Sequence, residues 1–359
     1  MIEKKQKWNY VKNGSIAVVV ILIAFAVHFY DSKAHKLISF NSVSAKTFLN
    51  KTQVAKADTP HMVVLSPLDT ALYNAGLSEM VHGKPSDKWP AKTPYPMPGA
   101  ILPFKRIVAY YGNFYSANMG ILGALPPDQM LAKLQGEVKK WQQADPKTPV
   151  LPALHYIAVT AQSKPGKNNT YRLRMPFTQI DKVLELAKKI NAIVFLDIQV
   201  GHSTLQQEIP ALDTYLRMPN VHLGIDPEFA MKNGKIPSTV IGTLDAKDIN
   251  YAANYLVQLT KKYHLPPKIL VVHRFTQDMV TNYKRIETHP EVQIVMNMDG
   301  WGFPAKKINS YRLAIVREPV QFTGFKLFYK NDLTEGAKVL MTPEQVLNLN
   351  PAPLYIQYQ

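Results

Sequence analysis

The sequence has no cysteine among its 359 residues. This absence excludes disulfide bonds, thiolate metal sites, cysteine nucleophiles and a lipid attached to an N-terminal cysteine. Acidic residues are also scarce, with 26 Asp and Glu against 42 Lys and Arg, so the formal net charge is +16. That balance favours anionic surroundings such as phospholipid or cell-wall polymer. Basic and aromatic residues do not interleave as they do in nucleic-acid-binding motifs, so we expect no nucleic-acid partner.

Several motifs of cofactor and catalytic sites are missing as well. The first predicted strand is followed by a single glycine, Gly112, and not by Gly-x-Gly-x-x-Gly, which argues against a dinucleotide site. The sequence has no His-x-His or His-Glu-x-x-His motif that would indicate a metal site. It also has no Gly-x-Ser-x-Gly motif that would indicate a serine nucleophile. We therefore expect no cofactor and no resident metal ion.

The N-terminal region has the features of a membrane-targeting segment. A group of lysines precedes an apolar run at residues 16–27, which is short for a full membrane span. Ala24-Phe25-Ala26 fits a small-x-small cleavage site, yet apolar character continues to Phe29. Residues 1–30 are predicted to be an uncleaved signal anchor or, alternatively, a cleaved signal peptide. Either way, the rest of the chain is expected outside the cytoplasm, membrane-attached or secreted.

Residues 31–104 are predicted to be a stalk followed by a proline-rich linker. Prolines are dense between residues 60 and 103, where they remove backbone donors and disfavour regular elements. The segment 84–98 is expected to be an extended strap that lies on the body of the protein or holds it away from the membrane. Trp89 and Tyr95 within it indicate that it packs against something.

From residue 105 onward, short apolar runs alternate with amphipathic stretches. The runs predict strands at 107–112, 150–159, 193–199, 221–225, 269–275, 292–298, 324–329 and 354–358. The stretches predict helices at 126–141, 178–190, 203–217, 245–263, 277–285, 304–316 and 342–349. Strands buried on both faces are typical of parallel sheets. The alternation over 105–359 predicts a (β/α)8 TIM-type barrel, with a doubly wound open sheet as the alternative.

The strongest local signal is Gly224-Ile-Asp226-Pro-Glu228, at the end of the fourth predicted strand. The carboxyl ends of barrel strands carry the chemistry, and residues two apart on a strand face the same side. Asp226 and Glu228 are therefore expected to point together into the barrel mouth. Two neighbouring carboxylates raise one pKa, and a raised carboxylic acid can protonate a glycosidic leaving group. Alternatively, Asp226 accepts from amides of the turn and Glu228 pairs with a lysine.

Other strand ends supply further candidates. Asp197 and Gln199 share a face, which suits recognition of hydroxyl or acetamido groups, and Asp299 is a candidate charge-stabilising group. His155 and His273 are candidates for substrate binding or proton transfer, or else buried structural histidines. The remaining candidates for substrate binding at the mouth are Tyr110 (or its neighbour Tyr111), Trp301, Lys326 and Tyr329.

The Asp226-x-Glu228 motif on a fourth strand resembles that of the chitinase-like (β/α)8-barrel glycoside hydrolases. The resemblance implies that Glu228 is the general acid and that Asp226 supports a substrate acetamido group, which acts as the nucleophile. Met296-Asn-Met298-Asp299 is similar to the family's Met-x-Tyr-Asp, with Met298 in place of tyrosine. The chain departs from the family at Gly224 and His222, where further aspartates are expected, and it has no tryptophan on the last strand.

These observations predict a membrane-anchored extracytoplasmic hydrolase, a glycosidase acting on cell-envelope or other glycans. Glu228 would be the general acid, and Asp226, Asp197 and Asp299 would orient groups or stabilise charge. The expected partners are a glycan or cell-wall polymer and the membrane itself. Two alternatives remain. One is a non-catalytic surface barrel that binds wall polymer or a partner protein. The other is a metal-dependent phosphodiesterase or deacetylase that uses the acids and histidines of the same rim.

Overall fold

The computed structural model describes residues 66–336 and 338–359. Its main sheet closes on itself, because β1 pairs in parallel with both β2 and β11. The parallel strands, in ring order, are β1 (Arg106–Gly112), β2 (Val150–Ala161), β4 (Ile193–Ile198), β5 (Val221–Ile225), β7 (Lys268–Arg274), β9 (Val292–Met298), β10 (Phe322–Leu327) and β11 (Tyr355–Tyr358). The predicted (β/α)8 barrel is confirmed, and the open-sheet alternative is wrong.

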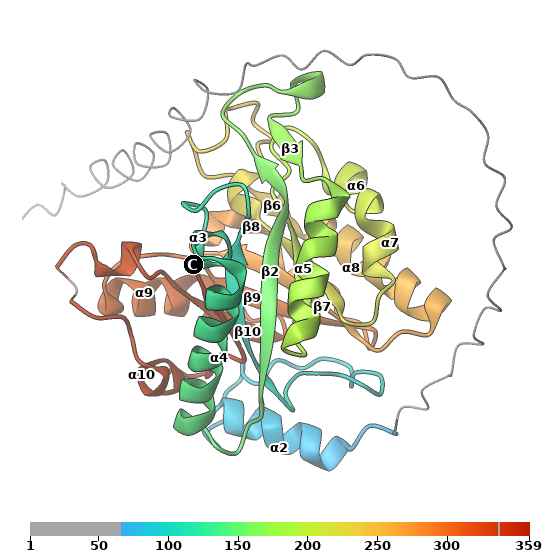
Figure 1. Cartoon of the computed structure of the whole chain (residues 1–359). Helices are drawn as coiled ribbons and strands as arrows, with labels where there is room; N and C mark the ends of the chain where they lie inside the picture. Colours follow the sequence, from blue (N-terminus) through green and yellow to red (C-terminus); the bar gives the residue numbers. More distant parts are fainter. Residues whose placement is uncertain (1–65, 337) are drawn as a thin grey trace, which may run out of the picture. The chain divides into compact units, whose positions relative to one another are not determined.

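Three short strands lie outside the ring. β3 (Arg172–Arg174) extends the sheet by pairing antiparallel with the end of β2, and β6 (Leu244–Asp245) pairs with β8 (Val280–Thr281). The α-helices are α2 (Thr70–Met80), α3 (Ile121–Ala124), α4 (Pro127–Ala144), α5 (Phe177–Lys189), α6 (Leu205–Glu208), α7 (Asp213–Leu216), α8 (Ala246–Tyr263), α9 (Pro304–Ser310) and α10 (Pro343–Leu347). Figure 1 shows α4 and α5 alongside β2, on the outside of the ring.

Two predicted helices differ from the structure. The one expected at 203–217 is divided into α6, a 3₁₀ turn at Pro210–Leu212 and α7, since Pro210 cannot donate to the preceding turn. The one expected at 277–285 is wrong, because 3₁₀ turns at Gln277–Met279 and Tyr283–Arg285 flank β8 instead. The helix predicted at 304–316 is present, with its second half, Tyr311–Val316, wound as a π-helix.

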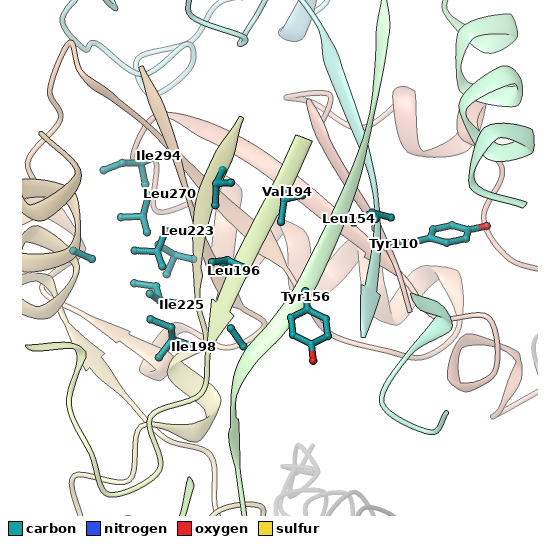
Figure 2. Close-up of a cluster of buried hydrophobic side chains, with 14 of the residues drawn as sticks. Tyr110, Leu154, Tyr156, Val194, Leu196, Ile198, Leu223, Ile225, Leu270 and Ile294 are labelled. Atoms are coloured by element: carbon teal, nitrogen blue, oxygen red, sulfur yellow. The ribbon is translucent and has the colours of Figure 1, made fainter. Parts of the chain in front are cut away.

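Alternate residues of each strand point to opposite sides of the barrel wall. The outward residues form a large apolar cluster with the helices, and Figure 2 shows Leu223, Ile225, Leu270 and Ile294 among them. The inward residues near the amino ends of the strands are also apolar and include Ala109, Ala153, Phe195, Val271 and Val295. Nearer the carboxyl ends, the interior becomes polar, and this change of character positions the candidate site.

The amino end of the barrel is closed by the segment that precedes β1. The Asp69 side chain caps α2 by accepting from the amide of Leu72, and Tyr73 packs with the inward apolar residues. Figure 1 shows α2 across this end of the barrel. Regular structure in the proline-rich region was not expected, and α2 forms because no proline lies between Pro67 and Pro85. Residues from Pro67 onward pack in the same compact unit as the barrel.

The strap at 84–98 lies on the body of the protein. The Trp89 ring is 4% exposed, and its indole N–H donates to the carbonyl of Val316 at 2.8 Å. Downstream of the strap, the Gln293 side chain binds the backbone of Leu102 inside the base of the barrel, accepting at 3.1 Å and donating at 2.6 Å. The proline-rich chain is therefore anchored by specific hydrogen bonds as well as by apolar contact.

Replacing Trp89 with Phe should lower the free energy of unfolding by about 1 kcal/mol. The substitution keeps an aromatic ring but leaves the carbonyl of the partly buried Val316 without this donor. Urea unfolding of the full chain measures the change. Tyr95→Phe is the matched control, since it removes a hydroxyl from a ring that is 48% exposed and bonded to Asn74. Equal unfolding midpoints for both variants would contradict a specific role of the indole hydrogen bond.

The predictions for the N-terminal segment and most of the stalk fall outside the described residues. Within residues 66–336 and 338–359, no helix combines the length and apolar character needed to cross a bilayer.

Candidate functional site

Polar side chains from every strand of the ring converge inside the carboxyl end of the barrel. They are buried, with exposed fractions of 0–8%. The set comprises Tyr111 of β1, His155 of β2, Asp197 of β4, Asp226 after β5, His273 of β7, Asn297 and Asp299 at the end of β9, Lys326 of β10, and Tyr355 and Gln357 of β11. So many ionisable groups out of water are costly unless they satisfy one another, and their pairing determines what the site can do.

Asp197 lies at the centre of this polar interior. Its Oδ1 is 3.2 Å from His155 Nε2 and 3.4 Å from His273 Nε2, and its Oδ2 accepts from the Tyr111 hydroxyl at 3.0 Å. Burial by itself opposes ionisation, but His273 and His155 hold the pKa of Asp197 below its usual value. Asp197 is therefore a carboxylate at neutral pH, as expected for a charge-stabilising group.

His273 bridges Asp197 and Asp299. Its Nδ1 is 2.8 Å from Asp299 Oδ2, and Lys326 Nζ is 2.8 Å from Asp299 Oδ1. Burial would lower the pKa of His273, but the two aspartates raise it to about 10. Burial likewise opposes ionisation of Asp299, yet Lys326 and His273 lower its pKa. Asp197, His273, Asp299 and Lys326 therefore form a row of groups that alternate in charge. This alternation stabilises the buried charges inside the barrel.

His155 has a different character from His273. Its Nδ1 lies 2.6 Å from the Tyr355 hydroxyl and 3.1 Å from Gln357 Nε2, and burial lowers its pKa to about 4 despite the neighbouring Asp197. The ring is neutral at physiological pH. Gly224 makes room for it, because a Cβ at that position would overlap both His155 Nε2 and Asp197 Oδ1.

Asp226 and Glu228 lie in the turn that follows β5. The strand ends at Ile225, so the two carboxyl groups are brought together by a 3₁₀ turn, Pro227–Phe229, and not by strand alternation. Asp226 Oδ1 accepts from the backbone amide of Glu228 at 3.1 Å, and Oδ2 lies 3.5 Å from Gln199 Nε2. The expected turn-capping role of Asp226 is thus observed, together with its position at the edge of the polar interior.

The two acids of this turn titrate at unusually high pH. Burial, reinforced by Asp299 and Asp197, raises the pKa of Asp226 to about 7, although His273 opposes the shift. Burial and the adjacent Asp226 raise the pKa of Glu228 to about 8. Asp226 is 3% exposed, whereas Glu228 is partly exposed. Glu228 is therefore a protonated acid at neutral pH, in the partly exposed turn that follows β5.

Three predicted site residues do not join this cluster. Tyr110 and Tyr329 lie on the outer side of the wall, where their hydroxyls are 2.9 Å apart and Tyr110 packs with the outward apolar residues. The prediction that Tyr110 and Tyr329 lie at the mouth is therefore wrong. On β1, the inward position belongs to residue 111 and not to residue 110. Trp301 is in the loop after β9, half-buried, with Lys306 Nζ 4.5 Å from its ring centroid.

Of the two alternatives on β1, Tyr111 is the one that joins the cluster, whereas Tyr355 and Gln357 were not predicted from the sequence. Tyr111 donates to Asp197, and the Tyr355 hydroxyl and the Gln357 amide contact the same nitrogen of His155. The sequence does contain an indication of these two residues. Gln357 is a polar residue within an apolar strand, and it is two positions after Tyr355, so both side chains face the same side of the sheet.

Comparison with known proteins identifies no family for this chain. No protein-family model matches the chain, and no curated protein matches it. Among solved structures, it is similar to dihydropteroate synthase from Burkholderia cenocepacia, in complex with 7,8-dihydropteroate. The identity is 10% and the TM-score 0.30, over 71% of this chain and 86% of that chain. The barrel assignment rests on the strand pairing described above.

Proposed function

We propose that the chain is a glycoside hydrolase in which Glu228 donates a proton to the leaving group. The observation that carries this proposal is the position of Glu228. It is a partly exposed residue in the turn at the carboxyl end of β5, and its backbone amide donates to buried Asp226. A general acid needs access to substrate from solvent and a proton at working pH. The pKa of about 8 supplies the second requirement.

The surrounding groups suit the rest of such a reaction. Cleavage of a glycosidic bond develops positive charge on the sugar ring, and a fixed carboxylate stabilises that charge. Asp197 and Asp299 are carboxylates held in place by His155, His273 and Lys326. Asp226 is near Gln199, and this pair offers both a carboxyl group and an amide to a substrate acetamido or hydroxyl group.

We infer that the substrate is a glycan of the cell envelope. The formal charge of +16 favours an anionic polymer or surface, and the N-terminal apolar segment would attach the barrel to the outer side of the membrane. A barrel that only binds wall polymer is the competing function. It would share the charge but would not need a protonated carboxylic acid at the rim.

The deciding experiment is incubation of the full chain with purified envelope glycans, with release of reducing ends as the measurement. We expect release by the wild type and a large loss with Glu228→Gln, which keeps the size of the side chain and removes the transferable proton. Equal release by the two proteins would refute the assignment of Glu228. Glycan binding by both proteins without release by either would favour the binding function.

The activity should fall as pH rises through about 8, because Glu228 must be protonated to act. Stability should change in the same direction. The folded-state pKa of Glu228 lies above the usual value of 4.5, so the folded state binds more protons than the unfolded state between these values. The stabilisation is therefore present at low pH and lost as pH approaches 8. Rate profiles and urea unfolding from pH 5 to about 10 test both statements.

A rate that increases between pH 7 and 9 would contradict Glu228 as the acid. For stability, Glu228→Gln is the informative variant. As the pH rises, the unfolding midpoint of the wild type should fall relative to that of the variant. The reason is that only the wild type must then ionise the carboxyl group of residue 228.

A further inference from the structure

We propose that His155, Asp197 and His273 bind a divalent transition-metal ion in the interior of the barrel. This inference goes beyond the proposed hydrolase function, since it concerns neither Glu228 nor Asp226. The three residues come from β2, β4 and β7, so the closed sheet brings together groups that are far apart in the sequence. Their ligand atoms all lie within 4.8 Å of one another, and all three side chains are fully buried.

The spacing of the ligand atoms fits a metal centre. His155 Nε2 and His273 Nε2 are 3.2 and 3.4 Å from the same oxygen, Asp197 Oδ1. Ligand atoms bound to Zn²⁺ at about 2.0–2.1 Å in a tetrahedral arrangement are about 3.3 Å apart. Two imidazoles and one carboxylate form a donor set that first-row divalent ions accept, with coordination positions left over.

A second observation concerns His273. Its Nδ1 is used by Asp299 at 2.8 Å, while its Nε2 is fully buried and has no hydrogen-bond partner among the described residues. The Nε2 atom is 3.4 Å from Asp197 Oδ1, so the two groups form an ion pair, but the geometry of a hydrogen bond is not met. A buried nitrogen of this kind is costly unless something else satisfies it. A metal ion would do so by taking the place of a proton on Nε2.

The groups behind the histidines are arranged as supports. Metal-bound histidines generally give their other ring nitrogen to a carboxylate, carbonyl or hydroxyl, which fixes the ring and its tautomer. Asp299 has this role toward His273, and the Tyr355 hydroxyl has it toward His155. Within the described part of the chain, the buried Gln357 Oε1 atom has no hydrogen-bond partner, and rotating the amide by half a turn would place an acceptor beside His155 Nδ1. His155 Nε2 would then present its lone pair toward Asp197.

Gly224 forms one wall of the proposed centre. A side chain there would overlap His155 Nε2 and Asp197 Oδ1, the two ligand atoms that face β5. Only glycine allows the backbone of β5 to approach the ligand atoms this closely. Because Gly224 has no side chain, the space beside these atoms is not filled from β5. The remaining neighbour of Asp197 is Tyr111, whose hydroxyl engages Oδ2 and leaves Oδ1 for the ion.

The test is metal binding by the full chain after treatment with a chelator and removal of the chelator. Zn²⁺ is the probe for stoichiometry, measured by mass spectrometry of the desalted protein, and Co²⁺ absorption reports the coordination. We expect about one ion per chain and an affinity reduced at least 100-fold in Asp197→Asn and in His273→Gln. Asp299→Asn, which weakens the support of His273 and the ion pair with Lys326, should reduce the affinity for Zn²⁺ by about 10–100-fold.

Two variants serve as controls. His202→Gln removes an imidazole that is bonded to the carbonyl of Lys235 and lies outside the triad, and Glu228→Gln alters the proposed acid. Both should bind Zn²⁺ as the wild type does. Wild-type affinity in Asp197→Asn, or loss of binding in His202→Gln, would overturn the proposal. Metal binding without glycan hydrolysis would support this site and refute the hydrolase function. Glycan hydrolysis without metal binding would support the hydrolase function and refute this site.

If the triad variants do not fold, the wild type alone decides. X-ray absorption of the Zn²⁺-loaded chain should show two imidazole ligands, and the ¹⁵N resonances of two histidines should shift on loading. Fewer than two imidazole ligands, or no saturable Zn²⁺ binding, would refute the site.

Discussion

Glu228→Gln should reduce hydrolysis of a natural glycan by about 10²–10⁴-fold, the range that general acid catalysis contributes. An alkoxide leaving group is a poor one, so an unactivated glycosidic bond needs its oxygen protonated as it breaks. Glutamine has nearly the shape of glutamic acid but no proton to transfer. Circular dichroism and the unfolding midpoint at pH 6 should remain close to those of the wild type, since at that pH the glutamic acid is itself uncharged.

The same variant permits a sharper measurement with substrates of different leaving groups. An aryl glycoside whose phenol is acidic leaves with little help, so Glu228→Gln should lose far less activity on it than on a natural glycan. Glu287→Gln is the matched control, because Glu287 lies in an exposed segment, 3.8 Å from His289 Nε2. An equal loss on both substrate types would indicate that Glu228 positions the substrate and does not donate a proton.

The barrel itself could be predicted because its strands are short, continuous apolar runs buried on both faces. Each of the eight predicted runs overlaps a strand of the ring, and the segment at 221–225 has the same bounds as β5. The predictions of secondary structure that are wrong lie in segments where the local sequence pattern competes with pairing to a distant segment. The region 277–285 has Met279, Val280 and Tyr283 at helix-like spacing, but β8 pairs there with β6, a partner more than thirty residues away that periodicity cannot reveal.

The candidate site was predictable to a smaller extent. Charged groups inside apolar strands are rarely placed without a reason, and this identified Asp197, His273 and Asp299. Which of two adjacent residues faces inward depends on strand register, so the choice between Tyr110 and Tyr111 needed the structure. The convergence of His155, Asp197 and His273 on one oxygen depends on closure of the ring, which no local pattern contains.

Gly224→Ala should be among the most destabilising single substitutions in the barrel, with a loss of about 3 kcal/mol in the free energy of unfolding. The added methyl group would overlap Asp197 Oδ1 and His155 Nε2, and both side chains are fully buried with no room to withdraw. Either the strand shifts or the contact between His155 and Asp197 breaks. Breaking it removes part of the compensation for a carboxylate buried in the barrel.

Gly136→Ala is the matched control, since it makes the same chemical change in α4, where a Cβ meets no atom within 4 Å. Alanine is the better helix former, so this variant should gain about 0.5–1 kcal/mol. Urea unfolding of both variants measures the difference, and activity below the unfolding transition of Gly224→Ala reports on the site. A midpoint for Gly224→Ala within error of the wild type would show that β5 can move without cost. In that case Asp197 and His155 are not held by the close approach of this strand, and the rigid polar interior on which both proposals depend would not exist.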